Sequence, residues 1–125
     1  MRRTGLRVCD NRSGMSARLP AHLEASAIVR LAESRGGYAT VLHRGERDAG
    51  TILIVTLCRG KQAVLYERMP GLDGSRNFVA TKREDTEKSH DFHDYCARRR
   101  QQDSDLWLIE VDIADPERFI ADLPD

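Results

Sequence analysis

The segment TILIVTLCRGKQAVLYERM, residues 51–69, gives the strongest indication of how the chain folds. It contains two runs rich in β-branched and apolar residues, 51–58 and 62–69, with a short turn at residues 59–61 between them. In the first run both alternating sets of side chains are apolar, which is typical of a strand covered on both faces. We therefore predict two consecutive strands here, the first of them in the centre of a sheet.

The flanking sequence predicts three helices and further strands. Apolar residues three and four apart indicate a helix over residues 20–34, and Gly36 and Gly37 end it. A short last helix should begin with Asp115 as its N-cap and Pro116 at its first helical position. The remaining predicted elements are strands over 38–44, 76–82 and 105–113 and a helix over 86–101.

The order of these elements is helix, four strands joined by short turns, helix, strand and short helix. It predicts an α+β fold with a mostly antiparallel sheet of about five strands, in which a four-strand meander is joined by the last strand and helices pack on the sheet. We assign residues 15–125 to this single domain. Residues 1–14, MRRTGLRVCDNRSG, show no apolar periodicity, and we interpret them as a disordered leader or a start-site extension.

The charges of the chain are balanced. It has 125 residues, with 20 Lys and Arg against 20 Asp and Glu and a formal net charge of zero. This balance does not favour bulk electrostatic binding to nucleic acid or to an anionic membrane. The basic opening residues lack the apolar region of a secretory signal, and no window is apolar enough for a membrane span. We therefore expect a cytoplasmic protein without membrane contact.

The cysteines and glycines do not indicate a cofactor. Cys9, Cys58 and Cys96 are odd in number and far apart, which argues against a disulfide framework and against a zinc site of the usual spacing. Cys58 ends an apolar strand, so we expect it to be buried. The chain lacks the GxGxxG motif and the phosphate-binding loop motif, and we predict no cofactor.

Two charged loops are the first candidate for a site. In an up-down-up-down sheet the first and third connections lie at the same end, so residues 44–50 (RGERDAG) should lie near residues 70–76. Convergent arginines can bind carboxylate or phosphate in a forked geometry. The alternative is that these charges solvate two hairpin ends and pair with one another. The candidate ligand-binding residues are Arg44, Glu46, Arg47, Asp48, Arg68, Asp73 and Arg76.

The second predicted helix carries a weak metal-ligand pattern. His90, His93 and Asp94 lie three or four residues apart, so their side chains can be neighbours on one helix surface. Two histidines without a third committed ligand do not specify a metal site. The spacing of the apolar residues in the same helix favours a buried stripe with the histidines on its flanks, formed by Phe92, Tyr95 and Cys96.

A basic run ends the same helix. Arg98, Arg99 and Arg100 could contact nucleic acid. However, no aromatic residues are interleaved with them, and a helix C-terminus favours cations for electrostatic reasons alone. We do not favour nucleic acid as a partner.

Several long segments together resemble a known family. They are ARLPAHLEASAIVR, GGYATVLHRGERDAGTILIV, LYERMPGLDGSR and ARRRQQDSDLWLIEVDIADPERFI, which lie in this order between residues 17 and 120. They are similar to short alphaproteobacterial proteins known as domain of unknown function 1491 (DUF1491). The resemblance implies a free-standing bacterial cytoplasmic protein. It implies no activity, cofactor or catalytic residue.

Three functions are compatible with these patterns. The first is a non-catalytic binding or interaction module, a homodimer or the partner of another protein, that uses the charged loop end or a sheet edge. The second is a small hydrolase or transferase that acts on a phosphorylated or carboxylated substrate at the loop end formed by 44–50 and 70–76. The third is a nucleic-acid-binding accessory protein that uses Arg98 to Arg100. We rank them in this order, and we assign no catalytic residue.

Overall fold

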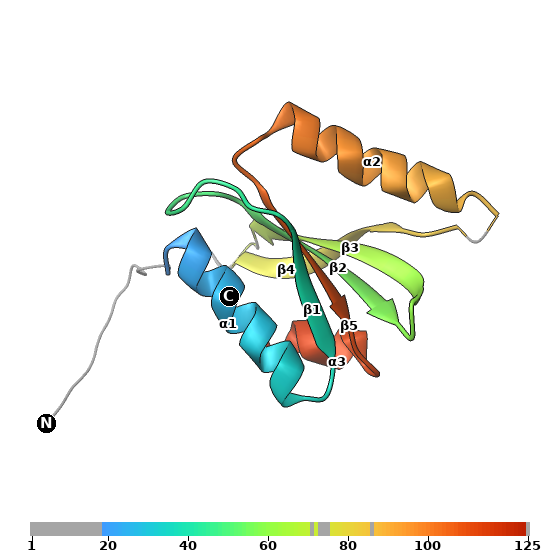
Figure 1. The fold of residues 1–125 in the computed structure, drawn as a ribbon, viewed down its shortest axis with the longest axis horizontal. Helices are drawn as coiled ribbons and strands as arrows, with labels where there is room; N and C mark the ends of the chain where they lie inside the picture. Colours follow the sequence, from blue (N-terminus) through green and yellow to red (C-terminus); the bar gives the residue numbers. More distant parts are fainter. Residues whose placement is uncertain (1–18, 71, 73–75, 86, 125) are drawn as a thin grey trace, which may run out of the picture.

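The computed structural model describes residues 19–70, 72, 76–85 and 87–124, so the predicted leader lies outside the described residues. Within them the chain forms three layers, with α2 on one face of a sheet and α1 and α3 on the other (Figure 1). The elements follow the predicted order: α1 (Ala21–Ser34), β1 (Tyr38–His43), β2 (Ile52–Cys58), β3 (Lys61–Pro70), β4 (Arg76–Arg83), α2 (Ser89–Gln102), β5 (Trp107–Asp112) and α3 (Pro116–Ala121).

The five strands form one sheet in the order β1-β5-β2-β3-β4. All neighbouring strands are antiparallel except β2 and β5, which are parallel, so the predicted α+β class with a mostly antiparallel sheet is confirmed. The predicted four-strand meander is wrong in its extent: only β2, β3 and β4 form a hydrogen-bonded meander, because β5 returns through α2 and lies between β1 and β2. Four of the six residues of β5 are buried and the other two are half-buried, because helices cover both faces of the sheet at this central strand.

Strand β2 has apolar side chains on both faces, as its sequence predicts. Ile52 and Ile54 pack in a core with α1 and α3, whereas Leu53 and Val55 pack in a second core beneath α2. Trp107 of β5 lies in the first core and Phe92 of α2 in the second. Among the helices of the described residues, none is both long and apolar enough to cross a membrane.

The turn between β2 and β3 is tighter than the sequence predicts. Arg59 and Gly60 both have positive φ, at 56° and 76°, and they connect the paired residues Cys58 and Lys61. Two central residues with positive φ match the twist of a two-residue hairpin. Just after the turn Gln62 also has a positive φ, at 60°, where β3 carries one residue more than β2 between successive pairs. The hairpin therefore includes a β-bulge at Gln62.

Candidate functional site

The charged loop between β1 and β2 caps helix α1. Pro20 offers this helix no side-chain cap. Instead, the carbonyl oxygens of Arg47 and Asp48 accept hydrogen bonds from the first amides, His22 N–H at 2.9 Å and Ala21 N–H at 3.0 Å. The first amides of a helix have no partner within it, so the loop supplies the acceptors that the helix lacks.

The same loop is fastened to the start of β5. The Glu46 N–H donates to the Asp105 carbonyl at 2.8 Å, and the indole N–H of Trp107 donates to the Glu46 carbonyl at 2.8 Å. A side chain at Gly45 would overlap the backbone of Asp105 and Leu106, which explains the glycine. The loop therefore packs on the sheet through its backbone.

The charged side chains of this loop interact mainly with the loop and its neighbours. The Glu46 carboxylate accepts hydrogen bonds from the N–H groups of Ala49 and Asp48, which lower its pKa below the ordinary value. Arg47 and Asp48 form an exposed ion pair at 3.9 Å, and the Arg44 guanidinium lies 5.4 Å from the centre of the Trp107 ring. Exposed pairs of this kind contribute little binding energy.

Arg68 lies apart from this loop. Strand directions place the loop and the β3–β4 connection at the same end of the sheet, as predicted. However, position 68 shares a strand face with Tyr66 and therefore lies under α1, where Arg68 forms a buried ion pair with Glu24. Arg76 begins β4 and is exposed, and Asp73 lies outside the described residues.

The histidines of α2 lie on its outer surface. His90 is exposed and lies 3.2 Å from the carboxylate of Asp91, its neighbour in sequence. His93 and Asp94 are also exposed. Within the part of the chain that the structure describes, no three His, Cys, Asp or Glu side chains gather as a metal site would require. The predicted stripe does face the sheet, but only Phe92 is buried, in the second core, whereas Tyr95 and Cys96 are half-buried and pack against it.

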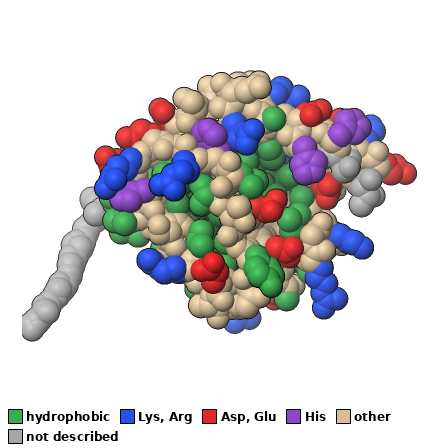
Figure 2. Space-filling view, in the orientation of Figure 1, with side chains coloured by type: hydrophobic (Ala, Val, Ile, Leu, Met, Phe, Trp, Pro, Cys, Tyr) green, Lys and Arg blue, Asp and Glu red, His purple; other side chains and the backbone are tan. Residues whose placement is uncertain are grey.

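The three arginines at the end of α2 lie in different environments. Arg99 binds the Glu67 carboxylate of β3 at 2.8 Å and the Tyr95 hydroxyl at 3.3 Å, so it holds the helix on the sheet. Arg98 is exposed and Arg100 is half-buried. On the face drawn in Figure 2, basic side chains are interspersed with acidic ones and with histidines.

Strand β1 is an open edge of the sheet and has no charged Lys, Arg, Asp or Glu residue. Its side chains alternate between exposed and half-buried, and the exposed set includes Tyr38 at 79% and Leu42 at 42%. The other edge strand, β4, carries Arg76, Lys82 and Arg83. Charged side chains are a common protection of an edge strand against pairing, so the two edges of this sheet differ.

A pocket on the α3 side of the sheet was missed by the sequence analysis. Its volume is about 570 Å³, and it lies between α3 and strands β2, β3 and β4. Cys58 lines this pocket and is half-buried, so the prediction that it is buried was wrong. A signal was present in the sequence, because Thr56 is a hydroxyl residue within the apolar run of β2.

A comparison with family models identifies the relatives of this chain. The model described as "Protein of unknown function (DUF1491)" matches residues 19–121. The chain belongs to the DUF1491 family. No match was found among curated proteins.

Solved structures of DUF1491 proteins share the fold. A crystal structure of a family member from Caulobacter crescentus CB15 is 29% identical, with a TM-score of 0.73, and the match covers 86% of this chain and 98% of that one. An NMR structure of a DUF1491 protein from the same organism is 28% identical, with a TM-score of 0.70 and coverages of 87% and 97%. The solution structure of protein Atu0922 from A. tumefaciens, at 23% identity and a TM-score of 0.68, covers 87% of this chain and 98% of its own, and it shows the fold alone.

Proposed function

We propose that this DUF1491 protein is a non-catalytic interaction module that works as a homodimer, with two copies joined through their β1 strands. The observation that carries the proposal is the uncharged, exposed edge of β1. Alternate backbone N–H and C=O groups of an edge strand face away from the sheet and can pair with another strand. Two copies would therefore form one continuous sheet.

The sequence of β1 is complementary to itself. In an antiparallel pair centred on Thr40, Thr40 would lie opposite Thr40 of the second copy. Tyr38 would face Leu42, which lies where the pairing of β1 with β5 is irregular, between Val41 and His43. These residues are on the exposed face of the strand, so the pairing would cover both large apolar side chains. Aromatic–aliphatic and Thr–Thr pairs are among the cross-strand pairs that stabilise sheets. A partner strand with a charged residue opposite Tyr38 or Leu42 would bind less well, because these apolar side chains would desolvate the charge without pairing with it.

The other edge favours the same conclusion. A partner strand added to β4 would lie beside Arg76, Lys82 and Arg83, and a second copy of β4 would bring these like charges together. Of the two edge strands in the described part of the chain, β1 alone combines exposed apolar side chains with no like-charge repulsion between copies. Because β1 has six residues, we expect a small interface and a dimer that dissociates on dilution.

The proposal is tested by sedimentation equilibrium over a concentration series. We expect the mass to rise from that of one 14.2-kDa chain toward twice this value as concentration increases. The substitution Thr40→Lys should abolish association, because it places two lysines directly opposite each other in the pair. Val79→Lys on the exposed edge of β4 is the matched control and should leave association unchanged. A chain that stays monomeric at all concentrations, or a Thr40→Lys variant that dimerises normally, refutes the proposal.

A further inference from the structure

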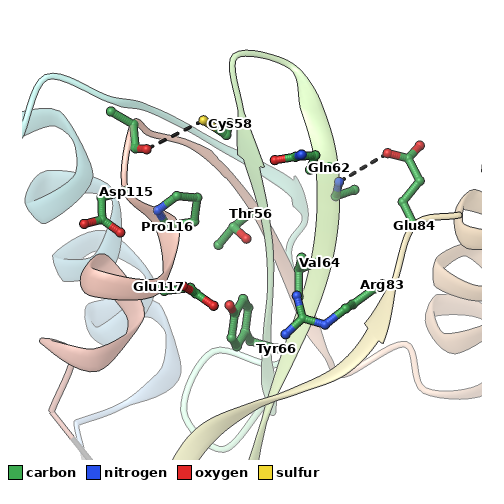
Figure 3. Close-up of a pocket in the computed structure, with 12 residues that line it drawn as sticks. Thr56, Cys58, Gln62, Val64, Tyr66, Arg83, Glu84, Asp115, Pro116 and Glu117 are labelled. Atoms are coloured by element: carbon green, nitrogen blue, oxygen red, sulfur yellow. Dashed lines mark hydrogen bonds between the residues drawn. The ribbon is translucent and has the colours of Figure 1, made fainter. Parts of the chain in front are cut away.

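The pocket between α3 and the sheet is large enough for a small molecule. Its volume of about 570 Å³ lies within the range of roughly 300–1,000 Å³ that is typical of small-molecule sites. Figure 3 shows it bordered by α3 on one side and by the β2–β3 hairpin and β4 on the other. Apolar side chains such as Val64 and Pro116 and several polar groups form its lining together.

The β-bulge after the hairpin turn shapes one wall of this pocket. Gln62, with its φ of 60°, is a lining residue, and the positive φ is unfavourable for a residue with a side chain. A bulge bends a strand and redirects a side chain, and bulges are common beside binding sites. Here it places the amide of Gln62 at the pocket, where it can donate to and accept from a ligand.

Two hydroxyl groups of the pocket have no hydrogen-bond partner within the described residues. Thr56 is 1% exposed, and its buried Oγ1 is unpaired in this part of the chain. Buried polar atoms normally have a partner, so this oxygen marks the pocket as unusual. Tyr66 is 6% exposed, and Figure 3 shows its hydroxyl group directed into the pocket.

Opposite charges lie on the two sides of the Tyr66 hydroxyl. Arg83 comes from β4 and Glu117 from α3, and Figure 3 shows both side chains directed toward Tyr66. Both charges act on that hydroxyl: burial raises the pKa of Tyr66, the positive charge of Arg83 lowers it and the negative charge of Glu117 raises it. Among the described residues neither Arg83 nor Glu117 has an ion-pair or hydrogen-bond partner.

We propose that this pocket binds a small zwitterion of the α-amino-acid class, with its carboxylate at Arg83, its ammonium group at Glu117 and its backbone near the Tyr66 hydroxyl. Arg83 offers the forked donor geometry that suits a carboxylate, and Glu117 can accept from an ammonium group. The two other carboxylates of the lining are engaged within the fold, Glu84 by the Ala63 N–H at 3.2 Å and Asp115 by the Arg118 N–H at 3.2 Å. A ligand with one charge would be attracted by one member of the Arg83–Glu117 pair and repelled by the other. A ligand with two separated opposite charges is attracted by both, so the pocket selects for it.

NMR titration of the full-length protein with each of the twenty proteinogenic amino acids tests the proposal. We expect at least one amino acid to shift the amide signals of Gln62, Tyr66, Arg83 and Glu117 saturably. For the amino acid that binds most tightly, two analogues are compared, one without the amino group and one without the carboxylate. Each should bind at least about tenfold more weakly, because each loses one charge-assisted hydrogen bond. Equal binding of a single-charge analogue contradicts the zwitterion, and no saturable shift with any amino acid refutes the site.

Substitutions at the exposed charges locate the binding. Arg83→Gln and Glu117→Gln should each weaken binding by about tenfold or more while leaving the folded spectrum intact. The matched controls are Arg76→Gln at the far end of the same strand and Glu33→Gln on the exposed surface of α1, which should bind normally. Unchanged binding in Arg83→Gln or in Glu117→Gln overturns the assignment. The Thr40→Lys variant should retain ligand binding, so failure of the dimer and failure of the pocket are distinguished.

Discussion

Arg68 of β3 and Glu24 of α1 form an ion pair in which both side chains are largely buried, at 7% and 11% exposure. The Arg68 guanidinium also donates to the Pro124 carbonyl at 3.0 Å and lies 4.5 Å from the centre of the Phe78 ring. One arginine therefore connects the first helix, two neighbouring strands and the C-terminal segment. The charges of this pair are compensated within the fold, and we assign Arg68 to stability rather than to ligand binding.

Removing one member of this pair should be costly. Arg68→Ala leaves the Glu24 carboxylate buried without its partner, and we expect the free energy of unfolding to fall by about 3–5 kcal/mol. The double substitution Glu24→Met with Arg68→Met removes both charges and should recover most of this loss. Urea unfolding of the three proteins measures the effect. If the double variant is as unstable as Arg68→Ala, the loss comes from packing and not from an uncompensated charge.

The charged loop should make stability depend on pH through Glu46. Hydrogen bonds from the Ala49 and Asp48 amides lower the pKa of Glu46 from its ordinary value of 4.5, so the folded state favours the ionised carboxylate. This contribution is present above the ordinary pKa and is lost as pH falls through the lowered pKa of the folded state. Glu46→Gln should therefore lower Tm at neutral pH, and its difference from the unsubstituted protein should shrink progressively as the pH is lowered below 4.5. A difference that is constant with pH contradicts this origin.

The N-cap of α3 should contribute measurably to stability. The Asp115 carboxylate accepts a hydrogen bond from the Arg118 N–H at 3.2 Å, and Pro116 follows at the first helical position. Asp115→Ala should lower the free energy of unfolding by about 0.5–2 kcal/mol, because the amide loses its acceptor. Asp115→Asn keeps an acceptor oxygen and serves as the control in the same denaturation experiment. Equal losses in both variants would show that the cap is not the cause.

Gly45 should tolerate no side chain. A Cβ at this position would meet the backbone of Asp105 and Leu106, so Gly45→Ala should force the loop away from β5 and cost about 1–3 kcal/mol. The control is Gly36→Ala, which faces open space and is strained only by its positive φ of 82°. Trp107 fluorescence should change in Gly45→Ala alone, because its indole N–H binds the Glu46 carbonyl. An unchanged spectrum would show that the loop stays in place.

The local patterns of the sequence predict most of the secondary structure. The first helix was expected over 20–34 and is Ala21–Ser34, and Asp115 and Pro116 begin the last helix as predicted. The second helix was expected from residue 86 but begins at Ser89, where Lys88 provides no side-chain cap that would mark the start. These predictions succeed because periodicity, capping and turn residues act between neighbours in the chain.

The position of β5 and the environments of the long side chains depend on contacts far apart in the sequence. The apolar character of β5 is visible in its sequence, but its insertion between β1 and β2 depends on pairing partners that lie 55 residues away in β2 and 65 to 74 residues away in β1. Arg68 was grouped with the charged loop because both lie at one end of the sheet, yet its strand face directs it beneath α1. The pocket likewise joins residues of β2, β3, β4 and α3 that no local pattern connects. Local interactions thus account for the elements, whereas long-range packing brings together the groups that could bind a ligand or a second copy.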